Sequence, residues 1–398
     1  MIDRNRENKI DGVVVVSKGS GISYEYSALN TKSYYIAKIL KAYGFDVTIL
    51  SGIFYDSKSN CTNAGEYNRI KYYLPSWYSG SRKIGLKTVQ KLIHTVKVLF
   101  FLIQLKRKWR KIYYIFDDNS ISIPFLLLLE WFGLIHLVYN IEEWPYGRKL
   151  SFKQKIIAWI FTGLPLKMCN KVIAVSSYLI SKAKEYNEKS VGYCLPAISD
   201  FDKVAHLDLY DDDETVRYLY CGNVGYTNVI YAIIDAFYGV NALLPNAHIE
   251  LDLVLHGDKG DIERVKEYLD SSKSSVLILS DLSEADLDLQ YAKATVLLAP
   301  LRHTLQDKAR FPQKIAEYVS HSKPIITTMI GDVGHYFESD ISAIFINEFS
   351  ASEIEKKMIY VIENLAVVKE IGKSGHAVGL KYLDYKSHTD GLGDFILS

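Results

Sequence analysis

The clearest chemistry in the sequence lies in a basic loop and the helix start that follows it, between residues 299 and 328. An apolar run at residues 295–299 predicts a buried strand, and Pro312 suits the first turn of a helix. On that helix Lys314 and Glu317 are three residues apart and share a face. The face presents an anion-binding cation beside a carboxylate that can accept two hydroxyl hydrogen bonds, as from a ribose. The loop before the helix adds the cations Arg302, His303, Lys308 and Arg310.

Short motifs around this helix form a family signature when they are taken together. They are Phe311-Pro312, Lys314, Glu317-Tyr318, Lys323-Pro324-Ile325-Ile326 and Gly331. This arrangement resembles the donor site of GT-B glycosyltransferases of family 4, the bacterial surface-polysaccharide type. The resemblance implies an α/β chain with the GT-B fold, in which two Rossmann-like α/β/α domains face each other across a cleft.

The resemblance also assigns roles to individual residues. In that family the second acidic residue of a paired-glutamate motif binds the nucleotide ribose, and Glu317 matches it. The first glutamate contacts the transferred sugar, but Ala309 stands at its position. The family's retaining transfer lets the leaving phosphate help deprotonate the acceptor, so it implies no protein nucleophile, and GT-B enzymes generally require no metal or other cofactor. Glu142 stands near a position where many members carry histidine, so it is a candidate to orient or deprotonate an acceptor hydroxyl, with helix capping as the alternative.

The basic loop suits the charge that develops during such a transfer. Breaking a sugar–diphosphate bond leaves growing negative charge on the phosphates, and cations must meet it. We take Arg310 and Lys314, with Glu142, as the catalytic candidates, and Arg302 and Lys308 as donor-binding candidates. The alternative is that Lys314 and Glu317 form an ordinary solvated pair at a helix start.

The first half of the chain alternates between strand and helix patterns. Residues 12–16 predict a buried strand, the turn after it contains Gly19, and a helix through Lys41 leads to a strand at 45–50. Later strands each end in polar residues. These strands are 112–116 before Asp117 and Asp118, 136–141 before Glu142, and 171–175 before Ser176. Open α/β sheets bind ligands at this edge, so we expect these side chains to line one crevice.

Aromatic residues follow the first glycine turn, where the family's amino domain faces acceptor. Tyr24 and Tyr26 offer planes for sugar stacking, and with Asp118 they are the acceptor-binding candidates. The alternative is that these tyrosines pack with the hydroxyl outward.

A second alternation begins at residue 216 and turns at Gly222-Asn223-Val224-Gly225. Backbone amides at the helix start after this turn can face phosphate. Gly222, Asn223 and Gly257, together with Gly19, are therefore donor-binding candidates. The family's usual basic pair is not found around the turn, and simple tight-turn roles for the glycines are the alternative.

These patterns predict two domains. Residues 1–197 form an acceptor domain, 198–213 a linker and 214–379 a nucleotide-sugar domain. Residues 380–398 form a segment that crosses back to the amino domain.

Composition excludes some classes of protein. The formal net charge of +1 gives no general attraction to nucleic acid. The four cysteines are scattered, which disfavours a zinc site or a disulfide framework, and the charged N-terminus lacks an apolar signal core. We therefore expect a cytoplasmic protein.

Two apolar stretches raise the question of a membrane. Residues 121–139 contain Pro124, Glu130 and Gly133, which favour a helix, a turn and a strand over a membrane span. Residues 92–111 combine a helical apolar stripe with the basic run from Lys106 to Lys111. This run is either a solvated helix end or a peripheral contact at the inner face of the plasma membrane, with Trp109 at headgroup depth.

The sequence thus predicts a hexosyltransferase that uses a UDP- or GDP-linked sugar and a glycan or lipid-linked acceptor in polysaccharide biosynthesis. A non-catalytic GT-B subunit that binds nucleotide or glycan is the alternative, supported by Ala309 and the missing basic pair. A sugar-nucleotide epimerase on the same fold is the weaker alternative.

Overall fold

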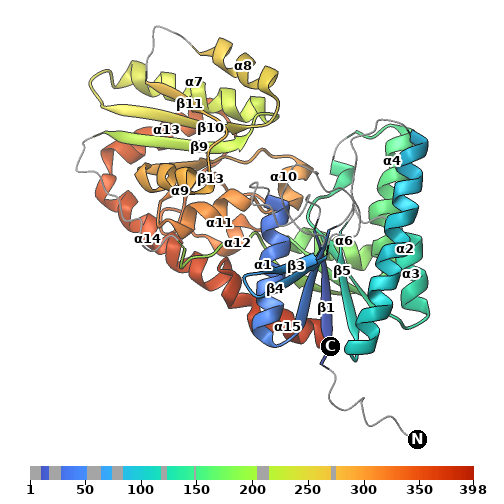
Figure 1. Cartoon of the computed structure of the whole chain (residues 1–398). Helices are drawn as coiled ribbons and strands as arrows, with labels where there is room; N and C mark the ends of the chain where they lie inside the picture. Colours follow the sequence, from blue (N-terminus) through green and yellow to red (C-terminus); the bar gives the residue numbers. More distant parts are fainter. Residues whose placement is uncertain are drawn as a thin grey trace, which may run out of the picture. The chain divides into compact units, whose positions relative to one another are not determined.

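Two compact units make up the chain. The computed structural model describes residues 10–17, 28–51, 64–73, 84–117, 123–147, 149–203, 215–269 and 275–398. The first unit comprises Met1–Pro196 and His388–Ser398, and the second comprises Ala197–Ser387. Each unit is built on its own, mainly parallel sheet (Figure 1).

The sheet of the first unit has the strand order β3-β4-β2-β1-β5-β6-β7-β8. Its neighbours are parallel except β3 and β4, an antiparallel pair at one edge. β1 is buried along its whole length, as expected of a parallel strand covered on both faces. The strands are β1 (Gly12–Ser17), β2 (Asp46–Ser51), β3 (Ala64–Tyr67), β4 (Ile70–Tyr73), β5 (Ile112–Phe116), β6 (His136–Ile141), β7 (Lys171–Ala174) and β8 (Val191–Cys194).

The helices of this unit connect successive strands. They are α1 (Ala28–Tyr43), α2 (Ile84–Lys108), α3 (Ile123–Trp131), η1 (Pro145–Gly147), α4 (Phe152–Ala158), η2 (Trp159–Gly163), α5 (Leu164–Met168), α6 (Ser177–Tyr186) and the last helix of the chain, α15 (Thr389–Leu397). α15 packs against α1. Lys171 Nζ donates to the carbonyls of Phe395 at 2.9 Å and Ile396 at 2.7 Å, which stabilises the C-terminal end of α15.

The interpretation of residues 121–139 is confirmed. α3 ends at Trp131, Gly133 turns the chain with φ of +66°, and β6 follows from His136. Among the described residues, the structure contains no helix with the length and apolar content that a membrane span requires.

Trp109 lies in the core, and its predicted headgroup position is wrong. It is only 3% exposed, and its indole fills the space beside Gly12, where any side-chain carbon would overlap the ring. Trp109 Nε1 donates to Asp46 Oδ2 at 3.0 Å. The next residue, Arg110, forms a bidentate pair with Asp11 at 2.9 Å. Trp109 and Arg110 of the Lys106–Lys111 run therefore bind side chains of their own unit.

The sheet of the second unit has the order β11-β10-β9-β12-β13-β14, with every pairing parallel. β9 to β11 lie on one side of its centre and β12 to β14 on the other, and in both halves the strands follow each other outward along the chain. The strands are β9 (Val216–Asn223), β10 (Ile249–His256), β11 (Val276–Leu279), β12 (Val296–Ala299), β13 (Ile325–Thr328) and β14 (Ile344–Ile346).

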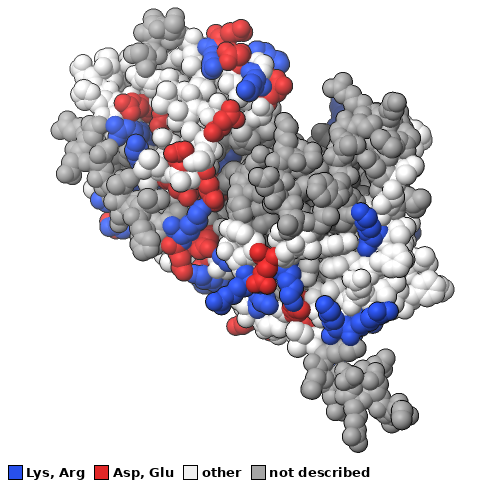
Figure 2. Space-filling model, viewed as in Figure 1, with Lys and Arg blue, Asp and Glu red and all other residues white. Residues whose placement is uncertain are grey.

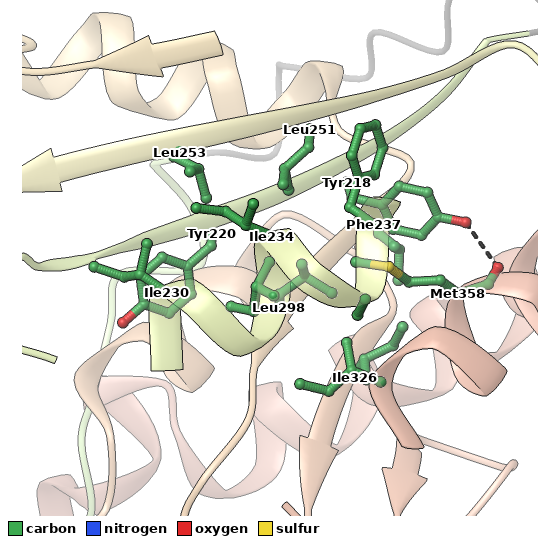
Figure 3. Close-up of a cluster of buried hydrophobic side chains, with 14 of the residues drawn as sticks. Tyr218, Tyr220, Ile230, Ile234, Phe237, Leu251, Leu253, Leu298, Ile326 and Met358 are labelled. Carbon is green, nitrogen blue, oxygen red and sulfur yellow. Dashed lines mark hydrogen bonds between the residues drawn. The ribbon is translucent and has the colours of Figure 1, made fainter. Parts of the chain in front are cut away.

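Helices cover this sheet and enclose its core. They are α7 (Thr227–Leu243), α8 (Lys259–Tyr268), α9 (Glu284–Lys293), α10 (Leu305–Ala309), α11 (Gln313–Ser320), α12 (Val333–Tyr336), α13 (Ala351–Glu363), α14 (Leu365–Tyr382) and the short η3 (Tyr385–His388). Phe237 of α7 and Met358 of α13 pack on Tyr218 of β9 within one buried cluster (Figure 3). Tyr218 Oη donates to the Met358 carbonyl at 2.7 Å, so this core also joins sheet and helix by a buried hydrogen bond.

Part of the predicted linker is described, and it packs on the second unit. Ile198 and Phe201 are buried, and the Phe201 ring lies so close to Gly379 of α14 that a side-chain carbon there would be 2.6 Å from Cζ. Residues 204–213 of the predicted linker lie outside the described residues.

Replacing Tyr218 with phenylalanine should lower the free energy of unfolding by about 1 kcal/mol, the usual net contribution of one hydrogen bond. Urea denaturation followed by circular dichroism measures this. Tyr231→Phe is the matched control, because Tyr231 stacks on Tyr268 through its ring, which the change keeps. Equal losses in the two variants would contradict the role of the Tyr218 hydroxyl.

Candidate functional site

Strand order reverses between β9 and β12, and the candidate site lies at this point. From β9 the chain proceeds to β10 and β11 on one side, and it returns to β12 and proceeds outward on the other. Open α/β sheets bind ligands at the carboxyl ends of strands where the order reverses. The Gly222–Gly225 turn follows β9, and the basic loop follows β12. Sequence segments about eighty residues apart therefore meet at one edge.

Lys314 lies directly against the end of β9. Its Nζ stands 4.2 Å from the centroid of the Tyr220 ring. A side-chain carbon at Gly222 would overlap both Lys314 Nζ and Tyr220 Oη. Within the described residues Lys314 makes no ion pair, so its charge is held by a π face and stays available to an anion.

Arg302 and Arg310 are held together by one buried carboxylate, Asp307. Arg302 donates to Asp307 from Nε at 2.8 Å and from Nη2 at 3.2 Å, and Arg310 Nη2 lies 2.7 Å from Asp307 Oδ1. Thr304 caps the N-terminus of α10 through Asp307 N, which fixes the carboxylate between the two guanidiniums. Burial alone would raise the pKa of Asp307, but the Arg302 hydrogen bonds and the Arg310 charge outweigh it and hold that pKa below its ordinary value.

Both guanidiniums also stack on the Tyr226 ring. Arg310 Cζ lies 4.8 Å and Arg302 Cζ 5.2 Å from its centroid. Tyr226 directly precedes α7, so the basic loop is attached to the start of that helix. Arg310 Nε is buried and has no hydrogen-bond partner among the described residues, which leaves one donor of this cluster for a ligand.

Glu317 follows Lys314 on α11, as predicted for this helix. Tyr291 Oη donates to Glu317 Oε2 at 3.3 Å, which orients the carboxylate. Burial, and then the charge of Lys314, lower the pKa of His256 at the end of β10.

The turn after β9 is stabilised by its own side chain. Asn223 Oδ1 accepts from Gly225 N at 2.8 Å. Gly257 has φ of +131°, a conformation that favours glycine, and a side-chain carbon there would lie 2.9 Å from Val224. The glycine-containing ends of β9 and β10 thus pack on each other beside Lys314.

Two residues of α10 differ from these cations in exposure or chemistry. The Lys308 side chain is exposed, and its carbonyl is covered by Gly331, where a side-chain carbon would lie 2.6 Å from it. Ala309 is fully buried. It therefore presents no polar group where the family signature carries its first glutamate.

In the first unit, Glu142 follows β6 and has two polar neighbours. Asn140 Nδ2 donates to Glu142 Oε1 at 3.0 Å, and Lys32 Nζ lies 3.9 Å from the same oxygen. Lys32 is 3% exposed and also donates to the Leu195 carbonyl at 3.1 Å. Asp117 is buried. Gly19, Tyr24, Tyr26 and Asp118 lie outside the described residues.

Sequence reasoning missed four side chains that shape these sites. Asp307 and Lys32 are buried charges, and Tyr220 and Tyr226 are the rings beneath the cations. A signal existed for two of them. Thr304 and Asp307 have the spacing of a helix cap, and Lys32 lies one turn before the buried Ile36. Within the described residues no cluster of His, Cys, Asp or Glu has the size needed to hold a metal ion.

Asp307→Asn should destabilise the protein at neutral pH by about 1–3 kcal/mol, because two guanidiniums then face a neutral amide. A lowered pKa stabilises the folded state above the unfolded value near 3.8, and this stabilisation disappears as pH falls through the folded value. The difference between wild type and variant should therefore be constant above about pH 5 and shrink below about pH 4. Urea denaturation across this range measures it, with Asp261→Asn, a partly exposed carboxylate that pairs along α8 with Arg264, as control. A difference that does not change with pH would rule out the ionised clamp.

Comparisons with known proteins agree with this architecture. Residues 215–364 match the family model described as glycosyl transferases group 1. A sucrose-phosphate synthase from Thermosynechococcus elongatus superposes with a TM-score of 0.73 at 14% identity, covering 96% of this chain and 98% of that chain. Anabaena HepE in complex with UDP and glucose gives 0.69 at 12% identity, with 98% and 100% covered. A glycosyltransferase from Rickettsia africae gives 0.68 at 15% identity, with 98% and 99% covered.

No curated protein sequence matches this chain. At 12–15% identity, the similarity to these solved structures establishes the fold. The family match, residues 215–364, lies within the second unit, which contains the cation cluster. The predicted fold class is confirmed. The chain therefore has the GT-B fold, and residues 215–364 of its second unit match the model of the group 1 glycosyl transferases.

Proposed function

We propose that the protein transfers a hexosyl group from a UDP-linked donor, with retention, to a hydroxyl of a glycan or lipid-linked acceptor. The observation that carries this proposal is the position of Lys314, held by Tyr220 against Gly222 at the end of β9. A cation without an ion-pair partner, beside a glycine turn that opens a helix, suits a diphosphate. HepE, which shares the fold, is described in complex with UDP and glucose, and this supports UDP over GDP as the donor nucleotide.

The donor diphosphate then binds among Lys314, Arg310 and Arg302. Asp307 offsets one of the two guanidinium charges and fixes their positions, while Arg310 Nε keeps a free donor. Cations whose geometry is set before the reaction stabilise developing negative charge without reorganisation. Glu317, oriented by Tyr291, accepts from the ribose hydroxyls.

Transfer proceeds by exchange of one bond at the sugar's anomeric carbon. The bond from this carbon to the phosphate oxygen breaks as the bond to the acceptor oxygen forms on the same face. The acceptor proton passes to the leaving phosphate oxygen, so no protein nucleophile takes part. Glu142, with Asn140 and Lys32 beside it, orients the acceptor hydroxyl in the first unit. The setting we infer is polysaccharide assembly in the cytoplasm, at the inner face of the plasma membrane.

Ala309 favours one other candidate function. Because this residue is buried and apolar, the site lacks the carboxylate that the family uses on the sugar. A non-catalytic subunit that binds nucleotide alone would have no need of that carboxylate.

Turnover separates these two functions. Purified protein is incubated with UDP- and GDP-hexoses, with and without polyprenyl-diphosphate-linked and free glycan acceptors, and release of nucleoside diphosphate is measured. Acceptor-dependent release, with a product whose anomeric configuration matches the donor by NMR, supports the proposal. Nucleotide binding in calorimetry with no turnover on any acceptor supports the non-catalytic subunit.

Gly222→Ala should weaken UDP binding and lower kcat by on the order of 100-fold, since the new methyl group displaces Lys314 Nζ. Lys314 Nζ ends a flexible side chain and can move, but the buried Tyr220 ring must also shift, so circular dichroism melting verifies that the fold survives. Gly225→Ala is the control in the same turn, where the new carbon would meet only Asn223 Oδ1 at 3.0 Å. Lys314→Ala should reproduce the loss. Normal kinetics in both Gly222→Ala and Lys314→Ala would mean that the phosphates bind elsewhere.

Glu317→Ala should reduce UDP affinity by about 1.5–3 kcal/mol, the range for hydrogen bonds to a charged group. A matched comparison uses UDP and 2′,3′-dideoxy-UDP in calorimetry. The variant should bind both nucleotides equally, whereas wild type should prefer UDP. If the variant keeps the wild-type preference, Glu317 does not contact the ribose.

A further inference from the structure

α2 has a second apolar face that the first unit leaves exposed. Its inner face packs into the unit through Val98, Leu102 and Leu105, which are all buried. Its outer face carries Val89, Ile93, Val96, Phe100 and Ile103, at alternating steps of four and three residues, and all five are exposed. Phe100 is 62% exposed. A helix that is apolar on both faces normally has a partner for each, so this outer face indicates an interaction surface.

The surface continues from α2 onto α3. A pocket of about 230 Å³ is lined by Leu99, Leu102 and Ile103 of α2, by Leu129 of α3 and by Leu134, which follows the Gly133 turn. Ile103 belongs to both the exposed stripe and the pocket. Beyond the pocket, Trp131 is 78% exposed and Phe132 lies beside it with ring centroids 4.9 Å apart. We call the outer face of α2, the pocket and these two rings the α2–α3 surface.

Charge on this surface has a single sign. Every charged residue from Ile84 to Lys111 is a lysine or an arginine, although the whole chain carries nearly equal numbers of acids and bases. Lys106 and Arg107 complete the lining of the apolar pocket. On the side of the unit where α2 and α3 lie, Figure 2 shows white surface with isolated blue and no red. Glu130 of α3 accepts from Leu137 N at 3.0 Å, within the unit.

Residues 148–171, which follow Glu142 and Glu143 in the connection from β6 to β7, repeat the same combination. The exposed residues Phe152, Ile156 and Trp159 are spaced along one side of α4 and η2, and every charged residue at 148–171 is basic. The strands β5, β6 and β7 are neighbours in that order, so right-handed connections put α2, α3 and α4 on one face of the sheet. The apolar and basic character therefore extends from α2 and α3 to α4 on this face of the unit.

We propose that the α2–α3 surface binds an anionic phospholipid bilayer. Phe100, Ile103 and Trp131 enter the boundary between headgroups and acyl chains, the pocket takes the end of an acyl chain, and Lys106 and Arg107 meet lipid phosphates. A second copy of the chain is a poorer occupant, because two such faces would bring basic side chains against each other, and the one acid of α2 and α3, Glu130, already accepts from Leu137 N within its own unit. This contact concerns the first unit alone and is independent of the donor and of the acceptor.

Vesicle sedimentation tests the proposal on the full-length protein. Wild type is mixed with vesicles of phosphatidylcholine alone, or with about 30% phosphatidylglycerol, at low salt and at about 0.5 M NaCl. We expect binding to the anionic vesicles that weakens in high salt. The apolar variant is Phe100→Ser with Ile103→Ser, and the charge variant is Lys106→Glu with Arg107→Glu. Each should reduce the partition coefficient by about tenfold or more.

Matched controls make the same types of substitution at residues of the second unit. Leu243→Ser with Leu277→Ser replaces two exposed leucines, and Lys259→Glu with Lys293→Glu reverses two exposed lysines. Both controls should bind vesicles much as wild type does. Circular dichroism melting and UDP calorimetry on every variant verify the fold and distinguish loss of lipid contact from loss of the donor site.

Three outcomes would overturn the proposal. They are absence of wild-type binding to anionic vesicles at low salt, equal losses in the test and control variants, and a wild-type dimer in light scattering that Phe100→Ser with Ile103→Ser dissociates. The last result would make a second copy the occupant of the α2–α3 surface.

Discussion

Parallel strands impose one constraint on which the rest of this structure depends, because all their carboxyl ends meet at the same edge of a sheet. In the second unit this edge receives the glycine turn after β9 and the basic loop after β12. Lys314 reaches it from α11, which follows that loop. The polar groups of the candidate site therefore come together because of strand order, while the apolar core beneath Tyr218 holds the strands that carry them.

Charge within this site is arranged by burial. Two guanidiniums would repel each other at such close range, and Asp307 allows them to share the Tyr226 ring. The desolvation cost of a buried carboxylate is offset by its several hydrogen bonds. Lys314 has a different environment, because its ammonium group lies over the aromatic ring of Tyr220 and not beside an acidic side chain. A cation held in this way keeps its full charge for an anionic ligand, which is the physical basis for assigning the diphosphate to this position.

The first unit combines two chemistries at two places. At the end of β6, Glu142 contacts Asn140 and the buried Lys32, and this polar group suits a hydroxyl-bearing acceptor. The helices that follow β4 and β5 present apolar and basic side chains instead. The proposed acceptor site and the proposed lipid contact therefore use different side chains of the first unit, so each proposal can be tested without the other.

The sequence by itself determined the features that depend on local spacing. The alternation of strands and helices, the turn at Gly133 and the shared face of Lys314 and Glu317 follow from periods of two and 3.6 residues and from the backbone preferences of glycine and proline. The fold class followed from a motif that runs from Phe311 to Gly331, across one helix and the start of the next strand. Ala309 was visible as a departure from that motif, although its burial was not.

Only the tertiary structure decided which charged and aromatic side chains face a partner. Trp109 stands among lysines in the sequence, yet Gly12 leaves room for its ring in the core. Lys32 and Glu142 are distant in the chain, and Tyr220 reaches Lys314 only because β9 lies beside β12. Such pairings depend on the order in which strands join the sheet. Local sequence carries no record of that order, because hydrogen bonds between strands are alike whichever neighbour a strand takes.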